Sequence, residues 1–165
     1  RQFQECGRIL DAELGVPPFY AKFISAGGYP IVASARVNDY ALKEAAFLVN
    51  QLLAHRGDVR QAMIASGSRM CILGYSEFTT DLPEFSRQEA ARGFEQFSAQ
   101  DYWDARARGT GGSETDPYCS CAEENLLAYP GDPFAAVKQI DGITGIAENS
   151  RGPADSPSVV LYQST

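Results

Sequence analysis

A run of apolar residues at the spacing of one helix face is the clearest pattern in the chain. Between residues 40 and 55 the apolar positions follow one another at short, helix-like intervals: Leu42, Ala45, Ala46, Val49, Leu52 and Leu53. This spacing predicts an amphipathic helix over 40–55 that buries one side. Asn38 and Asp39 are suited to cap its beginning, and Gly57 is expected to end it.

A second, shorter helix is predicted directly after the first. Asp58 is suited to cap a helix over 59–65, which Gly67 closes. Two apolar runs flank the helices, residues 31–34 and residues 70–75, and each predicts a short buried strand. The order strand, helix, helix, strand requires a crossover connection. We therefore predict an α/β (α+β) domain, a small mixed sheet backed by helices, with long ordered loops.

The pattern is weaker on both sides of this central unit. Apolar residues at helical spacing predict short helices over 3–14 and 87–98. Residues 101–129 contain clustered glycines and are expected to form a long loop, and ordered loops of that length are often functional. Residues 159–162 are a short apolar run that predicts a final strand.

Composition and charge narrow the class of protein. The chain has 165 residues, a net charge of −7 and a pI near 4.7. No internal repeat or long linker divides it, so we expect one domain over 1–165. The negative charge argues against a nucleic-acid backbone as partner and against an anionic membrane surface. No apolar run approaches the ~20 residues of a membrane span.

The number of cysteines is informative about the cellular compartment in which the protein works. There are four: Cys6, Cys71, Cys119 and Cys121. An even number of cysteines in a processed chain favours disulfides and an oxidising compartment. The sequence opens at Arg1 rather than Met, which is typical of processing. Because Cys119 and Cys121 are too close to pair comfortably, we expect one of them to pair with Cys6 and the other with Cys71. The alternative is a cytosolic protein with four buried thiols.

The sequence lacks the residues that several classes of enzyme need for catalysis. The single histidine, His55, cannot form a two-histidine metal motif, and its place after a helix suits a role at the negative end of the helix dipole. Neither a Gly-x-Ser-x-Gly elbow nor a phosphate-binding glycine loop occurs. Arg56-Gly57-Asp58 spells the integrin-recognition tripeptide, although helix termination and capping explain the same letters.

Carboxylates are the remaining candidates for catalysis. Glu77 and Asp81 follow the predicted strand 70–75, where many α/β proteins place site residues, and Glu123 follows the last cysteine. Two carboxylates held several ångströms apart serve as acid and base in glycoside hydrolysis. The alternative is structural, since carboxylates in loops commonly cap helices and close turns.

Three segments together resemble a known family. They are Glu77-Phe-Thr-Thr-Asp-Leu-Pro-Glu84, Asp101-Tyr-Trp-Asp-Ala-Arg-Ala-Arg-Gly-Thr-Gly-Gly112 and Glu123-Glu-Asn-Leu-Leu-Ala-Tyr-Pro-Gly-Asp-Pro-Phe134. With them the chain resembles, from about Tyr20 to Phe134, a family of secreted zincin-like (metallopeptidase-like) proteins of bacteria, fungi and some animals. The resemblance implies a zincin-type N-terminal subdomain, in which a twisted sheet backed by helices lies over a metal site.

The resemblance ends where the family's zinc motif begins. In the family, the Tyr-Pro-Gly-Asp-Pro segment leads into a helix with the motif His-Glu-x-x-His, whereas residues 135–144 of this chain contain no histidine. We therefore divide the chain into a zincin-like region, 1–134, and a divergent segment, 135–165. Three explanations stay open: a shortened relative used for binding, one piece of a processed or spliced protein, or a sequence that departs from the gene product beyond Phe134.

These observations predict a secreted, non-catalytic binding or effector module. Its expected binding residues are aromatic side chains in glycine-rich loops, which give large contact area at low entropy cost: Tyr102, Trp103, Tyr118 and Tyr129. Their alternative role is closure of the core. The expected partner is an extracellular protein or a glycan. No metal site and no cofactor are expected, except zinc if a partner chain supplies ligands.

Two enzymatic alternatives stay open beside this interpretation. The first is a carboxylate-based hydrolase that uses Glu77, Asp81 or Glu123. The second is a zinc peptidase that a second chain completes.

Overall fold

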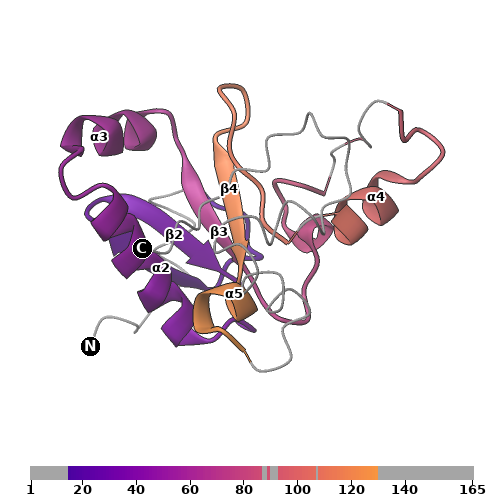
Figure 1. The fold of residues 1–165 in the computed structure, drawn as a ribbon, viewed down its shortest axis with the longest axis horizontal. Helices are drawn as coiled ribbons and strands as arrows, with labels where there is room; N and C mark the ends of the chain where they lie inside the picture. The colour runs from indigo at the N-terminus through magenta and orange to yellow at the C-terminus, as the bar shows by residue number, and fades with distance from the viewer. Residues whose placement is uncertain (1–14, 87–88, 90–92, 107, 130–165) are drawn as a thin grey trace, which may run out of the picture.

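The computed structural model describes residues 15–86, 89, 93–106 and 108–129 (Figure 1). Its elements in chain order are β1 (Lys22–Ala26), β2 (Tyr29–Ala33), α2 (Asp39–Leu52), α3 (Gly57–Ala65), β3 (Arg69–Leu73), the 3₁₀ helix η1 (Thr79–Asp81), α4 (Ala99–Arg106), β4 (Tyr118–Ala122) and α5 (Glu123–Leu127). A small mixed sheet is combined with helices, so the predicted α/β (α+β) class is confirmed. The helix predicted over 3–14 and the strand predicted over 159–162 lie outside the described residues.

The sheet has the strand order β1-β2-β3-β4. Strand β1 is antiparallel to β2, while β2, β3 and β4 are parallel to one another. Gly27 and Gly28 form the two-residue turn of the β1–β2 hairpin, with φ values of 62° and 95°. Positive φ at both central positions matches the twist of the strands and favours glycine. Strand β1, which precedes this turn, was not predicted from the sequence.

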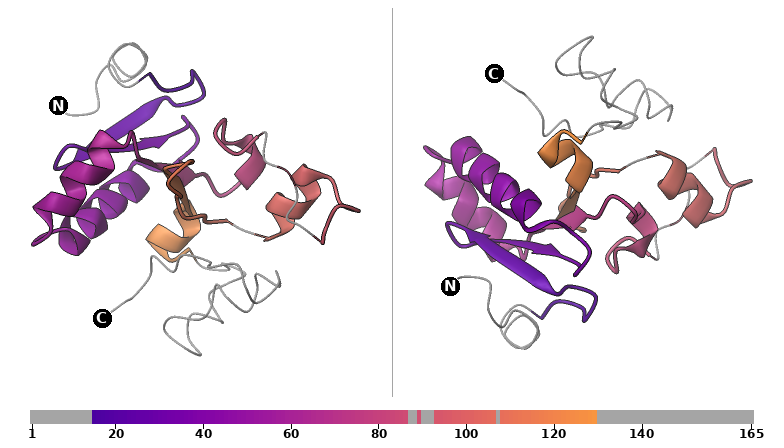
Figure 2. Two further views of the ribbon diagram at one scale, coloured as in Figure 1. Left: turned by 90° about the horizontal axis from the view of Figure 1, so that it is seen from above. Right: turned by 90° about the horizontal axis from the view of Figure 1, so that it is seen from below.

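Helix α2 covers one face of the sheet (Figure 2). Its side chains Leu42, Ala45 and Val49 are buried against Ile31 of β2 and Ile72 of β3. These α2 residues are the apolar positions from which the helix was predicted. The Asn38 side chain accepts a hydrogen bond from the Tyr40 amide at 3.0 Å, which confirms the predicted cap.

In the described part of the chain, loop segments pack on the opposite face of the sheet. Val32, Cys71 and Leu73 point to this face and pack with Leu82 and Phe85 from the loop after η1. Tyr20, from the segment before β1, belongs to the same cluster. Both faces of the three parallel strands are therefore apolar, as is usual for parallel sheets.

The expectations for Gly57 and Asp58 were wrong. Helix α2 ends at Leu52, and Gly57 is the first residue of α3 rather than the terminator of α2. Asp58 lies in the first turn of α3, whose cap position is taken by Arg56. His55 is exposed in the short connection between the two helices.

The second half of the chain differs most from the prediction. Residues 93–98 form turns and bends instead of the end of a helix. Residues 101–129, expected as a loop, contain most of α4 and all of β4 and α5. Among the described residues, no helix combines the length and the apolar character needed to cross a bilayer.

Candidate functional site

The carboxyl ends of the three parallel strands meet at one edge of the sheet. Ser34 follows β2, Gly74 follows β3, and Glu123 follows β4. In open α/β sheets this edge is the usual place for ligands. We refer to it as the carboxyl edge. Three glutamates are buried there: Glu77, Glu123 and Glu124.

Glu77 joins the ends of β2 and β3. The Ser34 hydroxyl donates to its Oε1 at 2.5 Å, and the Gly74 amide donates to its Oε2 at 2.7 Å. Only 1% of Glu77 is exposed. Both carboxylate oxygens therefore have donors within the protein, and water has almost no access to them.

Glu123 joins the end of β4 to two other segments. The amides of Asn38 and Tyr75 donate to its Oε1 and Oε2 at 3.1 Å and 3.0 Å, and the Tyr129 hydroxyl donates to Oε1 at 2.6 Å. This last bond raises the pKa of Tyr129, because the carboxylate it faces favours the protonated phenol. Glu123 thus links β4, the start of α2 and the loop after β3.

Glu124 is paired with Arg108, from the segment that leads into β4. Their side chains form an ion pair, and the exposed fractions of the two side chains are 16% for Arg108 and 1% for Glu124. The same guanidinium donates to the carbonyls of Gly74 at 3.0 Å and Glu77 at 2.6 Å. Arg108 therefore binds a carboxylate and the loop after β3 at once.

These contacts define what the carboxyl edge does chemically. A general acid or base needs a carboxylate oxygen that a substrate or water can reach. At this edge each glutamate is held by donors of the protein and is at most 5% exposed. The arrangement fixes three loops relative to one another, and we find no reachable carboxylate among these three residues.

Asp81, the other predicted catalytic carboxylate, lies apart from this cluster. It is exposed in η1 and accepts a hydrogen bond from the Phe78 amide at 2.8 Å. Asp104 of α4 accepts bonds from the amide and the hydroxyl of Thr80 at 3.0 Å and 2.9 Å. Both aspartates therefore stabilise the short helix η1, and for Asp81 this is the capping role that was its structural alternative.

Glu84 serves the opposite face of the sheet. It accepts hydrogen bonds from Tyr20 and from the Arg69 guanidinium, at 2.8 Å and 2.6 Å for the two nitrogens of Arg69. Burial alone lowers the pKa of Arg69, but its bonds and charge interaction with Glu84 raise it overall. The ion pair between Arg69 and Glu84 links the loop after η1 to β3.

The four predicted binding residues lie in three different places. Tyr102 and Trp103 lie on α4, whereas Tyr118 and Tyr129 lie at opposite ends of the β4–α5 segment. The Arg69 guanidinium lies over the Tyr118 ring, 4.2 Å from its centroid. The Tyr129 ring packs on Tyr75, with 5.9 Å between centroids. The structure therefore brings together only Tyr102 and Trp103.

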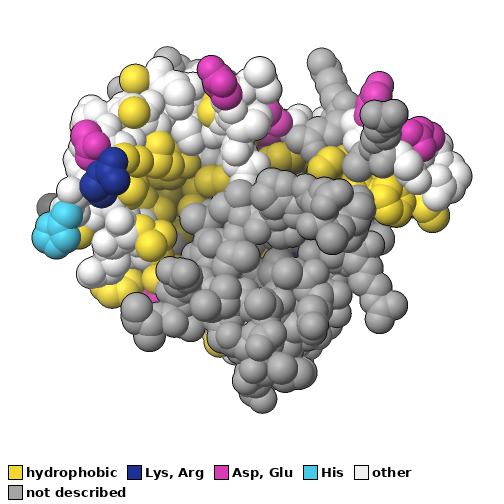
Figure 3. All heavy atoms as spheres, turned by 45° about the horizontal axis from the view of Figure 1, so that its top comes forward, with side chains coloured by type: hydrophobic (Ala, Val, Ile, Leu, Met, Phe, Trp, Pro, Cys, Tyr) yellow, Lys and Arg dark blue, Asp and Glu magenta, His cyan; other side chains and the backbone are white. Residues whose placement is uncertain are grey.

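An aromatic cluster surrounds Tyr102 and Trp103. The Tyr102 ring lies 5.1 Å from that of Trp103 and 5.2 Å from that of Phe94, which in turn lies 6.4 Å from Phe97. Phe97 is 50% exposed, whereas Tyr102 is 6% exposed. We call residues 93–106 the aromatic lobe. It stands away from the sheet (Figure 1), and apolar and acidic side chains lie side by side at that end of the surface (Figure 3).

The predicted disulfides are not formed among the described cysteines. Cys71, Cys119 and Cys121 are free and buried, and Cys6 lies outside the described residues. Cys71 pairs in register with Ser120, so its side chain points away from the face that Cys119 and Cys121 occupy. Because successive residues of a strand alternate in direction, a bond from Cys71 to either of them has the wrong geometry.

The structure also bears on the integrin-type tripeptide and on metal binding. Arg56 and Asp58, the ends of the integrin-type tripeptide, form an ion pair with each other at 3.0 Å. Within the described ranges, no group of three or more His, Cys, Asp or Glu side chains is arranged to hold a metal ion.

Comparison with protein-family models, with curated proteins and with solved structures finds no significant match to this chain.

Sequence reasoning identified two of the buried glutamates and missed their partners. Glu77 was singled out because it follows a predicted strand, and the structure places it at the end of that strand. Arg108 and Ser34 carried no signal of their own. A prediction of strand β4 would have pointed to Glu124, which lies just after it. The strand was not recognised because its sequence, Tyr-Cys-Ser-Cys-Ala, mixes small and polar residues and lies in a glycine-rich region.

Proposed function

We propose that this protein is a non-catalytic binding module, distantly related to secreted zincin-like proteins and without a zinc site. The observation that carries the proposal is the aromatic lobe, whose ring cluster ends in the half-exposed Phe97. The buried glutamates add support, because their oxygens are engaged by protein donors. Secretion rests on the family resemblance alone, since the described cysteines form no disulfide.

The form of the aromatic cluster favours a protein as the partner. The planes of neighbouring rings are tilted by 35° between Phe94 and Phe97, by 48° between Phe94 and Tyr102, and by 86° between Tyr102 and Trp103. A chain of sugar rings stacks best on coplanar, exposed aromatic faces, which this cluster does not offer. A protruding cluster of tilted rings is instead suited to insert into a pocket on a partner protein, as anchor residues of protein–protein interfaces do.

The lobe is also held in place, which favours recognition. Asp104 bonds it to Thr80 of the main body, and the Trp103 indole donates to the Glu89 carbonyl at 2.8 Å. Ser98 accepts a bond from the Asp101 amide at 3.0 Å and so begins α4. A preformed surface loses less entropy on binding.

The experiment compares Phe97 with a matched control, Phe47. Both are exposed to a similar extent, 50% and 55%, but Phe47 lies on α2. A photo-crosslinking phenylalanine analogue at position 97 or 47 is exposed to extracellular fluid proteins, and any protein captured only from position 97 is purified. Its affinity is then titrated against the wild-type chain and the variants Phe97→Ser and Phe47→Ser.

We expect Phe97→Ser to weaken binding at least about tenfold, as for an anchor residue, and Phe47→Ser to have little effect. Equal effects of the two variants would overturn the proposal. Binding to a glycan array that is lost in Phe97→Ser would make the ligand a sugar. Turnover of a glycoside or peptide panel that Glu77→Gln, Asp81→Asn or Glu123→Gln abolishes would favour the hydrolase instead.

A further inference from the structure

Three sulfur-containing side chains lie together on the face of the sheet that α2 covers. Strands β3 and β4 run side by side (Figure 1), and their register pairs Met70 with Cys119 and Ile72 with Cys121. Met70, Cys119 and Cys121 therefore share one face, and all three belong to the core cluster on that face. The function proposed above uses none of their sulfur atoms.

Two of the three sulfurs already stand at the separation that a bound metal ion requires. The Cys121 thiol donates to the Met70 thioether, with 3.9 Å between Sγ and Sδ. A metal–sulfur bond is about 2.3 Å long, so two sulfurs that a trigonal ion holds at about 120° are separated by about 4.0 Å. A metal ion can therefore take the place of the thiol proton between these two atoms.

Cys119 supplies the third sulfur. Its thiol donates to the Arg69 carbonyl at 3.7 Å and lies 3.5 Å from the Tyr29 hydroxyl. Neighbouring strands are about 4.8 Å apart, so Cys119 and its register partner Met70 are within reach of one ion. A change of the χ1 rotamer turns the Cys119 sulfur from the Arg69 carbonyl toward that ion.

The ligands select the kind of ion. Within the described ranges no third His, Cys, Asp or Glu side chain joins the two cysteines, so the remaining ligand is the thioether of Met70. Thiolate and thioether are soft ligands that favour Cu(I), whereas protein zinc sites are built from Cys, His, Asp and Glu. The three side chains belong to residues that are at most 9% exposed, which keeps water away from the ion.

We propose that Met70, Cys119 and Cys121 bind one Cu(I) ion in a three-sulfur site. Both thiols release their protons on binding, so the ion and its ligands carry one net negative charge. The Tyr29 hydroxyl, which lies 3.1 Å from the Ser68 hydroxyl, donates to the Cys119 thiolate and offsets this charge. Cys119 is the most exposed of the three ligands, and the ion enters on its side.

An anaerobic titration of the full chain with Cu(I) tests this proposal. Competition with the chelator bathocuproine disulfonate measures the affinity and the stoichiometry. The matched control is Cys71→Val, which removes a buried thiol from the opposite face of the sheet. A second control, Cys6→Ser, removes the cysteine that lies outside the described residues. Urea denaturation verifies that each variant is folded.

We expect one Cu(I) per chain, with the affinity unchanged in Cys71→Val and Cys6→Ser. Cys121→Val should lower the affinity more than about 100-fold and Tyr29→Phe about tenfold, because loss of an outer-shell partner alone costs about 10- to 100-fold. X-ray absorption should show three sulfur neighbours of copper in the wild type and two in Met70→Leu. This last substitution conserves volume, so the core should tolerate it.

Three results would overturn the proposal. A wild-type chain that takes no Cu(I) from the chelator has no such site. An affinity that is the same in Cys121→Val and in the wild type means that the ion binds elsewhere. Equal losses in Cys71→Val and Cys121→Val mean that thiols bind the ion without a defined site. None of these results bears on binding through Phe97, so the two proposals fail independently.

Discussion

The guanidinium of Arg108 and the carboxylate of Glu124 form a buried ion pair that connects the entry and the exit of β4. Arg108 precedes the strand and Glu124 follows it, and their Nη2 and Oε2 atoms are 3.1 Å apart. Because Arg108 also binds carbonyls of the loop after β3, the pair holds the whole carboxyl edge together. Both terminal nitrogens of the guanidinium thus donate to backbone carbonyls, and such additional hydrogen bonds are what a buried ion pair needs to be tolerated.

Removing one member of this pair should destabilise the fold strongly. We expect Arg108→Leu or Glu124→Leu to lower the free energy of unfolding by about 3–5 kcal/mol, because each leaves an uncompensated buried charge. The double variant should recover part of that loss. Urea denaturation at neutral pH measures both effects.

The exposed pair Arg56–Asp58 provides the control for this experiment. Its side chains are 61% and 69% exposed, so solvent screens their attraction. Arg56→Leu should leave the denaturation midpoint close to that of the wild type. A loss as large as that of Arg108→Leu would show that our account of burial at the carboxyl edge is incorrect.

The hydrogen bond between Tyr129 and Glu123 predicts a dependence on high pH. This bond raises the pKa of Tyr129 above its ordinary value. Its contribution to stability is therefore complete below the ordinary tyrosine pKa of about 10, and is lost as the pH rises through the raised value in the folded protein. NMR of ¹³C-labelled tyrosine should show a ring that titrates late and is missing in Tyr129→Phe.

Glu123→Gln separates the effect of charge from that of position. Without the carboxylate, the Tyr129 pKa should fall toward the ordinary value while the ring stays near Tyr75. If the titration of Tyr129 is the same in Glu123→Gln and in the wild type, the bond in the structure is not what raises this pKa.

Because they are buried, the described cysteines are expected to react slowly with alkylating reagents in the folded protein. Burial raises the pKa of both Cys71 and Cys119, so their thiols stay protonated at pH 8 and react poorly as nucleophiles. We expect iodoacetamide to leave Cys71, Cys119 and Cys121 unmodified in the folded protein. All three should be alkylated in guanidinium without a reductant.

Mass spectrometry of the alkylated peptides distinguishes this state from a disulfide-linked one. A peptide containing Cys119 and Cys121 that is alkylated only after reduction would contradict the free thiols of the structure. That result would restore the disulfide framework expected from the number of cysteines.

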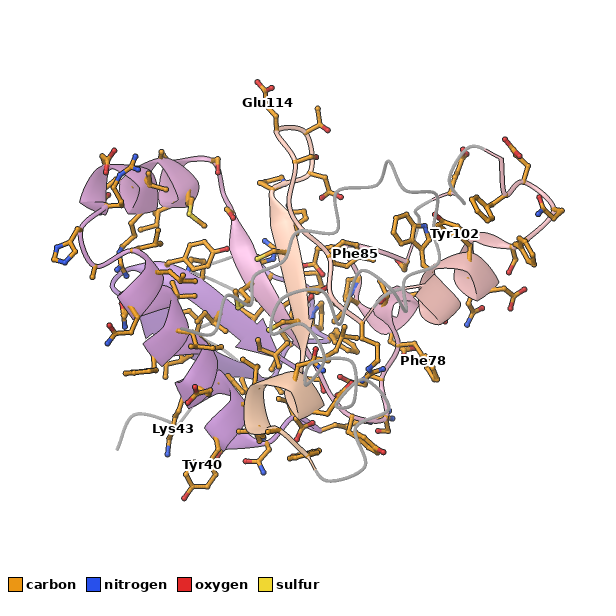
Figure 4. The ribbon with its side chains drawn as sticks, in the orientation of Figure 1. Tyr40, Lys43, Phe78, Phe85, Tyr102 and Glu114 are labelled. Carbon is orange, nitrogen blue, oxygen red and sulfur yellow. The ribbon has the colours of Figure 1, made fainter. Side chains whose placement is uncertain are left out.

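The bonds between Asp104 and Thr80 predict a local effect on the aromatic lobe. Asp104→Ala removes two hydrogen bonds that link α4 to η1. Because these bonds join α4 to η1, hydrogen exchange of the α4 amides should become faster while the thermal unfolding midpoint hardly changes. The control is Glu114→Ala, at the tip of the loop before β4 (Figure 4).

A general fall in protection across the sheet would argue against this local role. In that case Asp104 would contribute to the global fold, and the lobe would not open as a separate unit.

Periodicity along the sequence was sufficient to predict the centre of the fold. In α2, β2 and β3 the apolar positions are the buried ones, and buried positions recur regularly along each element. Strand β1 escaped prediction because it is a short edge strand with half-buried residues. The long loop predicted over 101–129 was wrong because α4 and β4 are fixed by contacts with distant segments, such as Thr80 and β3.

The sequence by itself determined the α/β class, the cap at Asn38, and the position of Glu77 after a buried strand. It also determined the lack of a two-histidine zinc motif, since composition alone decides that point. Only the tertiary structure decided that Glu77, Glu123 and Glu124 share one edge, that Arg108 closes it, and that Cys71 faces away from Cys119 and Cys121. The physical reason is that strand order and strand direction bring these residues together or apart, and neither leaves a local pattern in the chain.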